Sequence, residues 1–279
     1  MRITIRTGIA ISAGVLMGLL TQVAAADTLS RILKEKKLHV VTEAAMPPLE
    51  FIQDGKIVGL GKDILDYIVK KNNLELVQTN LPWQGVLPGL NAKRFDFVAT
   101  SVTITPERAK NYAFTIPVDE ATTYAVKRKS NKSINSIQDV NGKVGGTQLG
   151  SGTERSVRLW DKSQKDAGRK GLSELKLYST YPEMYLGVAN GEIDVGFHTL
   201  TALNSLMKNK PDTYTLIDRV SDQTYYSWLT RPEDASLRDF LNSHIKELIV
   251  SGKMAELQQK WFGKSTKLPL EGYLPPGAH

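Results

Sequence analysis

The sequence predicts an α/β fold that is built from two units of similar construction. Short apolar runs with the length of strands alternate along the chain with longer runs of helical periodicity, which is the pattern of an α/β protein. A second series of strand, Gly-rich turn and helix begins at Lys143. The stretch 188–196 also repeats the order of features in 90–98, where a helix end, a polar turn and a strand with one Asp follow each other. We therefore expect two lobes with related architecture.

The first unit is predicted from strand-like runs and the helices between them. Its last expected helix begins after Thr105, because Thr is a favoured N-cap residue and Pro106 suits the first helical position. The expected elements, in order, are a strand at 38–42, a helix at 63–72, a strand at 74–79, a helix at 83–92 and a strand at 95–99.

The connections between the two units predict a hinge. Strand candidates at 122–126 and 225–229 lie on either side of the second unit, and a helical segment at 237–261 is interrupted at 251–252. If this last segment packs on the first lobe, the chain crosses between the lobes twice, which suits closure on a ligand. The expected boundaries are 27–125 for the first part of lobe 1, 126–224 for lobe 2, 225–263 for the return to lobe 1 and 264–279 for an irregular tail.

Residues 1–26 resemble an export signal. Arg2 and Arg6 precede an apolar stretch at 8–23, and three alanines at 24–26 fit a cleavage site after Ala26. The alternative is a membrane anchor, for which the apolar stretch is short. We expect a mature chain of residues 27–279 that is not inserted in a membrane.

The composition argues against several classes of function. The chain has no cysteine, so it has no disulfide and no thiolate site, and its four histidines lack metal-ligand spacing. We place no Ser/His/Asp constellation and expect no cofactor, metal or catalytic residue. The net charge of +7 is spread out, and the basic cluster at 127–132 lacks interleaved aromatic residues. We interpret this cluster as part of the solvent-exposed surface. We expect no nucleic-acid partner.

Several stretches in a fixed order carry a family resemblance. The stretches are PPLEF at 47–51, VGLGKDIL at 58–65, WQGVLPGL at 83–90, SVTITPERAK at 101–110, FTIP at 114–117 and GK to KWFG at 252–263. With these stretches, the chain over residues 38–263 resembles the polar amino-acid-binding proteins of ABC importers, solute-binding family 3. The resemblance implies a two-lobed type II periplasmic binding fold, with a mixed sheet flanked by helices in each lobe and a two-strand hinge. It also implies a periplasmic monomer that binds a small ligand and the importer's membrane subunits.

Arg108 is the central candidate for ligand binding. A cation at the third position of a helix faces the positive end of the dipole, which costs roughly 0.3–1 kcal/mol. An Arg fork beside free backbone amides forms a site for an anion. From the residues alone, an exposed Arg beside an ordinary Thr-Pro cap is the favoured explanation. The resemblance implies that Arg108 clamps the ligand carboxylate and that Thr103 and Ser101 share it.

Other candidates would complete the pocket. The Gly/Ser turn at 150–154 is a plain connector or a second anion cradle, and the resemblance assigns Ser151 and Thr153 to the ligand carboxylate. It also places Trp83 and Met46 at pocket walls, although either residue would also suit the core. Some relatives that bind cationic side chains carry a carboxylate at the position of Glu43, which is otherwise an ordinary surface residue.

Thr199 departs from the family pattern. In amino-acid-binding relatives an Asp at this place pairs with the ligand α-ammonium, and a hydroxyl supplies no charge. A buried ammonium without a counter-charge costs several kcal/mol. The ligand then has a modified or absent α-amine, as in opines, N-substituted amino acids and keto acids, or another carboxylate replaces the Asp, with Glu43 and Glu120 as candidates. His198 beside this position is given no role.

The expected function is capture of a polar amino acid, or of a derivative such as an opine, for an ABC importer by hinge closure. The alternative is an enzyme on the same fold, similar to periplasmic cyclohexadienyl dehydratases, which need a general acid. Thr199 weakens this alternative, because the dehydratases resemble the binding proteins at that position.

Overall fold

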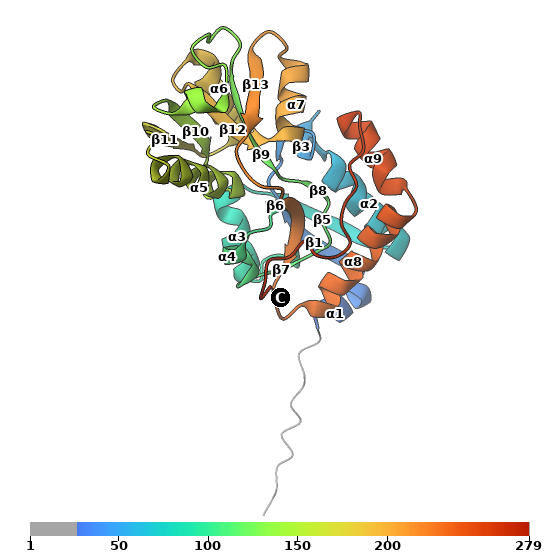
Figure 1. Ribbon diagram of the computed structural model, residues 1–279. Helices are drawn as coiled ribbons and strands as arrows, with labels where there is room; N and C mark the ends of the chain where they lie inside the picture. Colours follow the sequence, from blue (N-terminus) through green and yellow to red (C-terminus); the bar gives the residue numbers. More distant parts are fainter. Residues whose placement is uncertain (1–26, 279) are drawn as a thin grey trace, which may run out of the picture.

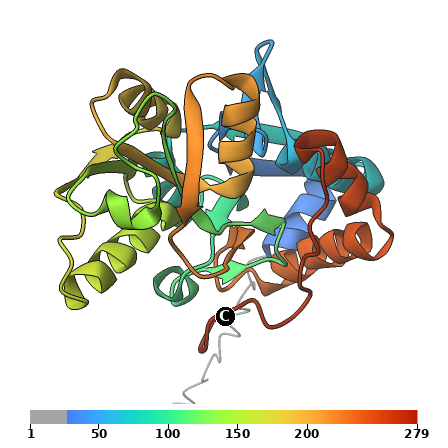
Figure 2. The same cartoon turned by 45° about the horizontal axis from the view of Figure 1, so that its top comes forward.

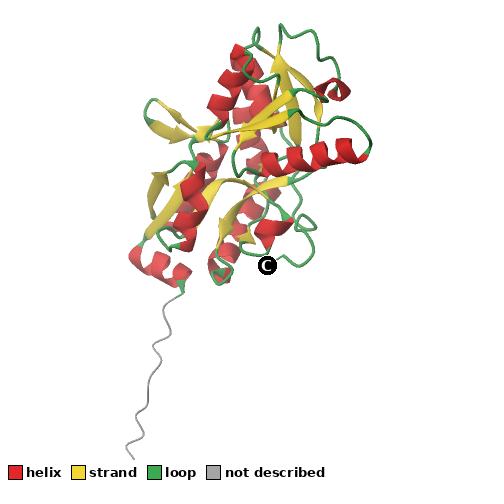
Figure 3. Ribbon diagram, turned by 90° about the vertical axis from the view of Figure 1, so that its left-hand side faces the viewer, coloured by secondary structure: helices red, strands yellow, loops and turns green. Residues whose placement is uncertain are grey.

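The computed structural model describes residues 27–278, so the predicted export signal at 1–26 lies outside the described residues. Two separate sheets, one in each half of the molecule, organise the chain (Figure 1). Figure 3 shows that helices flank both sheets, which confirms the predicted α/β class. None of the helices within 27–278 combines the length and the apolar character that a membrane span requires.

Lobe 1 is the half that contains the six-stranded sheet, in which β5-β1-β6-β14-β7 are neighbours and β8 pairs with β14. A small sheet of β2, β3 and β4 extends from it. The strands of lobe 1 are β1 (Lys37–Thr42), β2 (Ala45–Met46), β3 (Glu50–Gln53), β4 (Lys56–Val58), β5 (Glu75–Asn80), β6 (Phe97–Thr103), β7 (Ala113–Phe114), β8 (Asp119–Glu120) and β14 (Tyr225–Thr230). Its helices are α1 (Thr28–Glu35), α2 (Leu60–Asn72), α3 (Trp83–Asn91), α4 (Pro106–Ala109), α8 (Ala235–Val250) and α9 (Lys253–Phe262).

Lobe 2 is the half that contains the five-stranded sheet, in the order β11-β10-β12-β9-β13. Figure 2 shows this sheet and its helices beside lobe 1, with α8 and α9 on the far side of lobe 1. Its strands are β9 (Thr123–Arg128), β10 (Val144–Gln148), β11 (Glu174–Tyr178), β12 (Val195–Thr199) and β13 (Tyr214–Arg219). Its helices are the 3-10 helix η1 (Ile137–Val140), α5 (Gly152–Asp166), α6 (Tyr181–Asn190) and α7 (Leu200–Asn209).

Both sheets combine parallel and antiparallel strands in the same arrangement. β1 runs parallel to β5 and β6, and β10 runs parallel to β11 and β12. One antiparallel strand is then added in each lobe, β14 on β6 and β9 on β12. The internal repeat of the sequence is matched by two equivalent hydrogen bonds. Asp96 Oδ2 accepts the N–H of His39 at 2.8 Å, and Asp194 Oδ2 accepts the N–H of Val144 at 3.0 Å. Each Asp therefore secures the strand that lies between the two parallel neighbours in its own lobe, β1 in lobe 1 and β10 in lobe 2.

The chain passes between the lobes twice, and the two passages contact each other. One lies between β8 and β9, and the other lies between β13 and β14. Ala121 N donates to Thr224 O at 2.8 Å, and Val220 N donates to Thr123 O at 2.9 Å. β9 begins at Thr123, so this strand spans the boundary predicted after residue 125.

Several element limits differ from the sequence prediction. α2 starts at Leu60 rather than at residue 63, and β6 covers Phe97–Thr103 rather than 95–99. Every residue of β6 is buried, because the strand lies in the middle of the sheet with β1 on one side and β14 on the other. The carboxyl end of β6 therefore reaches farther toward lobe 2 than predicted. The predicted interruption at 251–252 is confirmed as the break between α8 and α9.

Candidate functional site

A small cavity, called here the cleft cavity, lies between the lobes where the carboxyl ends of parallel strands meet. Strand order and strand direction bring these ends together, which is where ligands bind in open α/β sheets. Glu43 follows β1, Ser101 and Thr103 end β6, and Gln148 ends β10. The cavity volume is about 20 Å³, room for one water molecule, so the lobes are closed on each other. The lining residues are Glu43, Met46, Trp83, Ser101, Val102, Thr103, Arg108, Gln148, Ser151, Gly152, Tyr181 and Tyr226.

All the predicted site residues except Thr153 and Thr199 line this cavity. Thr153 lies behind Tyr181, whose hydroxyl donates to Thr153 Oγ1 at 3.0 Å. Thr199 is fully buried, and its Oγ1 is 3.5 Å from the hydroxyl of Tyr226. Both threonines therefore contact lining residues rather than the cavity, and their contacts with a ligand stay predictions.

Arg108 lies between the two lobes. Its Nη1 donates to Thr103 O at 2.9 Å, and its Nη2 donates to Gly150 O of lobe 2 at 3.0 Å. The guanidinium also lies over the ring of Trp83, 5.0 Å from the ring centroid. Burial lowers the pKa of Arg108 to about 10, so the group stays charged at neutral pH. The side chain thus places a charged fork in the cleft.

The helix around Arg108 contributes less than the sequence predicted. α4 is a single turn of 4 residues, and Arg108 belongs to its end as much as to its start. The predicted cap is present, because Thr105 Oγ1 accepts the N–H of Arg108 at 3.2 Å. That bond uses the amide that was expected to face an anion. The guanidinium, and not the helix terminus, is therefore the candidate for binding an anion.

Glu43 is the acidic side chain that lines the cavity. Gln148 Nε2 of lobe 2 donates to Glu43 Oε1 at 2.6 Å, so the two lobes are also joined at this point. Burial raises the pKa of Glu43 to about 7, and the bond from Gln148 opposes this rise. Sequence reasoning missed Gln148, whose role depends on how closely β10 approaches the end of β1.

Ser101 is held from behind by a buried acid. Glu50 Oε1 accepts the Ser101 hydroxyl at 3.0 Å, and Glu50 Oε2 accepts the Ser101 N–H at 3.3 Å. Burial raises the pKa of Glu50 to about 8, so this acid is largely protonated at neutral pH. Glu50 lies outside the cavity lining and orients one of its hydroxyls.

Two tyrosines that the sequence analysis missed complete the aromatic wall. Tyr181 begins α6 after β11, as Trp83 begins α3 after β5, so the two rings occupy equivalent places in the two lobes. Tyr181 stacks on His198 with 3.4 Å between ring centroids. Thr180 and Glu183 form a capping box around the start of α6, and this pattern combined with the internal repeat would have pointed to Tyr181. Tyr226 comes from β14, opposite Thr103.

The Gly/Ser turn at 150–154 is held by its own side chains. Ser151 caps α5, because its Oγ accepts the N–H of Glu154 at 3.0 Å, as predicted for this turn. Glu154 Oε2 accepts the N–H of Gly150 at 2.7 Å, so a carboxylate of the protein already occupies part of the expected anion cradle. Gly152 faces Thr103 so closely that an added Cβ would lie 2.3 Å from the Thr103 side chain.

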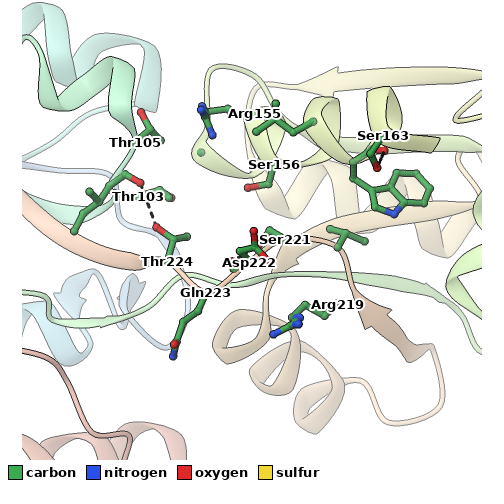
Figure 4. A pocket seen from close by; sticks show the side chains of 15 residues that line it. Thr103, Thr105, Arg155, Ser156, Ser163, Arg219, Ser221, Asp222, Gln223 and Thr224 are labelled. Atoms are coloured by element: carbon green, nitrogen blue, oxygen red, sulfur yellow. Dashed lines mark hydrogen bonds between the residues drawn. The ribbon is translucent and has the colours of Figure 1, made fainter. Parts of the chain in front are cut away.

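A larger groove, called here the side groove, lies at the edge of the same interface, with a volume of about 460 Å³ (Figure 4). It shares Thr103 and Gly152 with the cleft cavity. Figure 4 shows Arg155 and Ser156 of α5 facing lobe 1 across it. Arg155 pairs with Glu107 of α4, with Nε 2.7 Å from Oε2. Arg155, one of the two arginines that line the side groove, is therefore already paired. Among residues 27–278, no group of three or more His, Asp or Glu side chains is arranged to hold a metal ion.

Two α/β lobes joined by paired crossings, with a charged cavity between them, define a solute-binding protein of the type II periplasmic binding fold. The chain belongs to the bacterial extracellular solute-binding proteins, family 3, whose model matches residues 38–264. The ABC transporter arginine-binding protein 1 of Escherichia coli K12 is 24% identical over 232 residues, which cover 81% of this chain and 91% of that protein. The L-cystine-binding protein TcyJ of the same strain is 27% identical, and the match covers 84% of this chain and 86% of TcyJ.

Solved structures agree with this family. An ancestral arginine-binding protein bound to arginine superposes with a TM-score of 0.73 at 30% identity, and the match covers 82% of this chain and 99% of that structure. An ancestral amino-acid-binding protein, described as a precursor of cyclohexadienyl dehydratase, superposes with a TM-score of 0.74 at 24% identity over 84% of this chain and 99% of that structure. This second likeness concerns the fold alone.

Proposed function

We propose that this protein is the periplasmic solute-binding component of an ABC importer, and that it captures a small amino-acid-like solute by its carboxylate. The observation that carries this proposal is the position of Arg108, whose two terminal nitrogens donate to one carbonyl oxygen from each lobe. A carboxylate has two oxygens at the spacing of this fork and binds it more strongly than neutral carbonyls do. The names of the relatives, which bind arginine and cystine, support an amino acid or a derivative as the ligand.

Binding proceeds by opening and closing of the lobes. When the lobes separate, the bond from Arg108 to Gly150 is broken and the fork is free to bind the ligand carboxylate on lobe 1. The hydroxyls of Ser101 and Thr103 are on the same wall. Lobe 2 then closes through the paired crossings, brings Gln148 and Tyr181 onto the ligand and excludes water. The closed monomer is the form that the importer's membrane subunits recognise.

One observation favours the enzymatic alternative enough to name its test. Burial raises the pKa of Glu43 to about 7, which suits a general acid such as a dehydratase needs. Incubation with prephenate or arogenate distinguishes the two functions. We expect no turnover, and formation of a decarboxylated aromatic product would contradict the binding function.

The proposal is tested by calorimetry on an Arg108→Ala variant. A thermal-shift screen of amino acids and their derivatives first identifies a ligand, because a compound that binds the folded state raises its melting temperature. We expect Arg108→Ala to weaken binding of that ligand at least tenfold, about 1.4 kcal/mol. Arg169→Ala, at an exposed arginine of lobe 2, is the matched control and keeps the affinity. Equal affinity of the Arg108→Ala variant and the wild type would contradict the carboxylate clamp.

A further inference from the structure

The charged side chains that line the cleft cavity are one guanidinium and one carboxyl group. Arg108 supplies the positive charge and Glu43 the negative charge, and both belong to lobe 1. Lobe 2 contributes Gln148, Ser151, Gly152 and Tyr181, none of which has a charged side chain at neutral pH. Within the described residues 27–278, the cavity therefore has a counter-charge for one anionic group and for one cationic group.

Two other acids of lobe 1, Glu120 and Glu50, have partners away from the cleft cavity. Glu120, one of the two carboxylates considered as a replacement for the missing Asp, accepts the hydroxyl of Thr122 at 2.6 Å and does not line the cavity. Glu50 lies behind Ser101 with an exposed fraction of 1%. Of the two replacements that the sequence left open, only Glu43 lies where a ligand is enclosed.

Lobe 2 presents a neutral aromatic wall beside the place where a second counter-charge was expected. Tyr181 is fixed at its hydroxyl by Thr153 and along its ring face by His198. His198 Nε2 lies 3.3 Å from Met46 Sδ of lobe 1, so this wall also contacts the opposite lobe. Because burial lowers the pKa of His198 to about 3, the ring is neutral at physiological pH. The wall is closely packed and carries no charge.

The number of cationic groups on a ligand therefore determines the cost of enclosing it in the cleft cavity. A cation enclosed without a counter-charge costs several kcal/mol. Cation–π attraction to the aromatic wall does not compensate for this loss, because Arg108 already lies over the ring of Trp83 and His198 already stacks on Tyr181. Arginine and lysine carry two cations and one carboxylate, so one of their cations would remain unpaired in this cavity.

The geometry points to a ligand that is a net-neutral zwitterion, with one carboxylate on Arg108 and one cationic group on Glu43. This class includes neutral amino acids, N-acylated basic amino acids, and acids with a single amino, guanidino or quaternary ammonium group. The inference rests on the proposed function and adds the charge of the ligand to it. It also separates this protein from the relatives whose names give arginine as the ligand.

Calorimetry with matched compounds tests this inference. L-Arginine is compared with L-citrulline, which lacks the side-chain charge, with Nα-acetyl-L-arginine, which lacks the α-ammonium, and with glycine betaine. We expect at least one of the three net-neutral compounds to bind ten or more times as tightly as arginine. Arginine binding as tightly as or more tightly than all three overturns the inference and leaves the proposed function intact. Failure of every carboxylate-bearing compound in this panel and in the wider amino-acid screen overturns the proposed function, and the inference falls with it.

A charge added to lobe 2 gives an independent test. Gln148→Glu places a second carboxyl at the cavity, and Gln148→Met, of similar length, removes the amide without adding charge. We expect Gln148→Glu to shift the preference toward arginine, relative to the net-neutral compounds, by about tenfold, and Gln148→Met not to do so. Circular dichroism and thermal melting confirm that each variant is folded. An unchanged preference in folded Gln148→Glu would show that the number of carboxyl groups does not set the selectivity.

Discussion

The two lobes share one topology, yet they contribute different chemistry to the cleft. Lobe 1 provides Arg108, Glu43 and the hydroxyls of Ser101 and Thr103, whereas lobe 2 provides an amide, a small turn and a tyrosine. Their interiors differ in the same way. The buried acids of the described chain, which are Glu43, Glu50, Asp96, Asp119 and Asp234, all belong to lobe 1.

This difference suggests that two lobes of the same topology have different roles in ligand binding. Under the proposed function, lobe 1, which carries the charged side chains of the cleft cavity, recognises the ligand while the cleft is open. Lobe 2 needs only to fit closely and exclude water, which a neutral surface does at lower desolvation cost.

The largest effect is expected where lobe 2 must fit closely. In Gly152→Ala the new Cβ would lie 2.3 Å from the Thr103 side chain, so the lobes could not close fully. Overpacking of this kind costs about 1–3 kcal/mol, which corresponds to a loss of affinity of up to about a hundredfold. In the control Gly85→Ala the Cβ meets nothing closer than 3.6 Å. Calorimetry showing equal affinity for both variants would contradict the close-fit role of lobe 2.

The next effect concerns the buried acids of lobe 1. The pKa of Glu50 is raised from 4.5 to about 8 by burial, so the folded state keeps a proton that the unfolded state loses. Stability from this group is complete below pH 4.5 and is lost as the pH rises through about 8. Thermal melts between pH 5 and 8 should show a smaller decline for Glu50→Gln than for the wild type, by about 3 kcal/mol. The exposed control Glu271→Gln should follow the wild type, and a Glu50→Gln curve parallel to it would contradict the assignment.

Ligand affinity should also depend on pH through Glu43, because a cationic ligand group stabilises its ionised form. With a pKa of about 7, Glu43 is mostly ionised at pH 8 and mostly protonated at pH 6. The affinity for a ligand of constant charge should therefore fall about tenfold as the pH falls from 8 to 6. The titratable groups that influence Glu43 are Glu50, with a pKa of about 8, and Tyr181, with a pKa of about 12.

The Glu43→Gln variant isolates this contribution. We expect its affinity to be low at both pH values and nearly independent of pH, while Glu50 and Tyr181 are unchanged. Calorimetry at pH 6 and 8 measures both proteins. A wild-type affinity that does not change between these values, or a Glu43→Gln affinity that still falls tenfold, would contradict the pairing of Glu43 with a cation.

The smallest effect is expected at the rim of the cleft. Arg155 of lobe 2 and Glu107 of lobe 1 form an ion pair whose side chains are 37% and 63% exposed. Exposed pairs contribute about 0.2–1 kcal/mol, so Glu107→Gln should change the affinity less than about fivefold, and less still at high salt. A larger and salt-independent loss in calorimetry would show that charge on lobe 2 matters after all.

The sequence predicted those parts of the molecule that depend on local patterns. The stretch 101–110 places two hydroxyls and Arg108 at fixed spacing after a strand, and the structure brings all three to the cleft cavity. The alternation of elements predicted the α/β class, and the repeat at 90–98 and 188–196 corresponds to the equivalent positions of Asp96 and Asp194.

The missed parts depend on contacts between segments far apart in the chain. Tyr226 reaches the cavity because β14 pairs with β6 in the register Tyr226–Thr103, which no local pattern specifies. Gln148 contacts Glu43 only because the lobes close. Thr199 was placed by counting along one strand; its side chain contacts Tyr226, and its contact with a ligand stays a prediction. Residue spacing predicts the strand on which a side chain lies, whereas packing decides which cavity it lines.

The most direct test of the central claim is a crystal structure of the protein with the ligand that the thermal-shift screen identifies. We expect the ligand carboxylate to lie in the cleft cavity with its oxygens roughly 2.7–2.9 Å from the terminal nitrogens of Arg108. A carboxylate bound instead beside Arg155 in the side groove, or an Arg108 side chain turned to solvent, would contradict it.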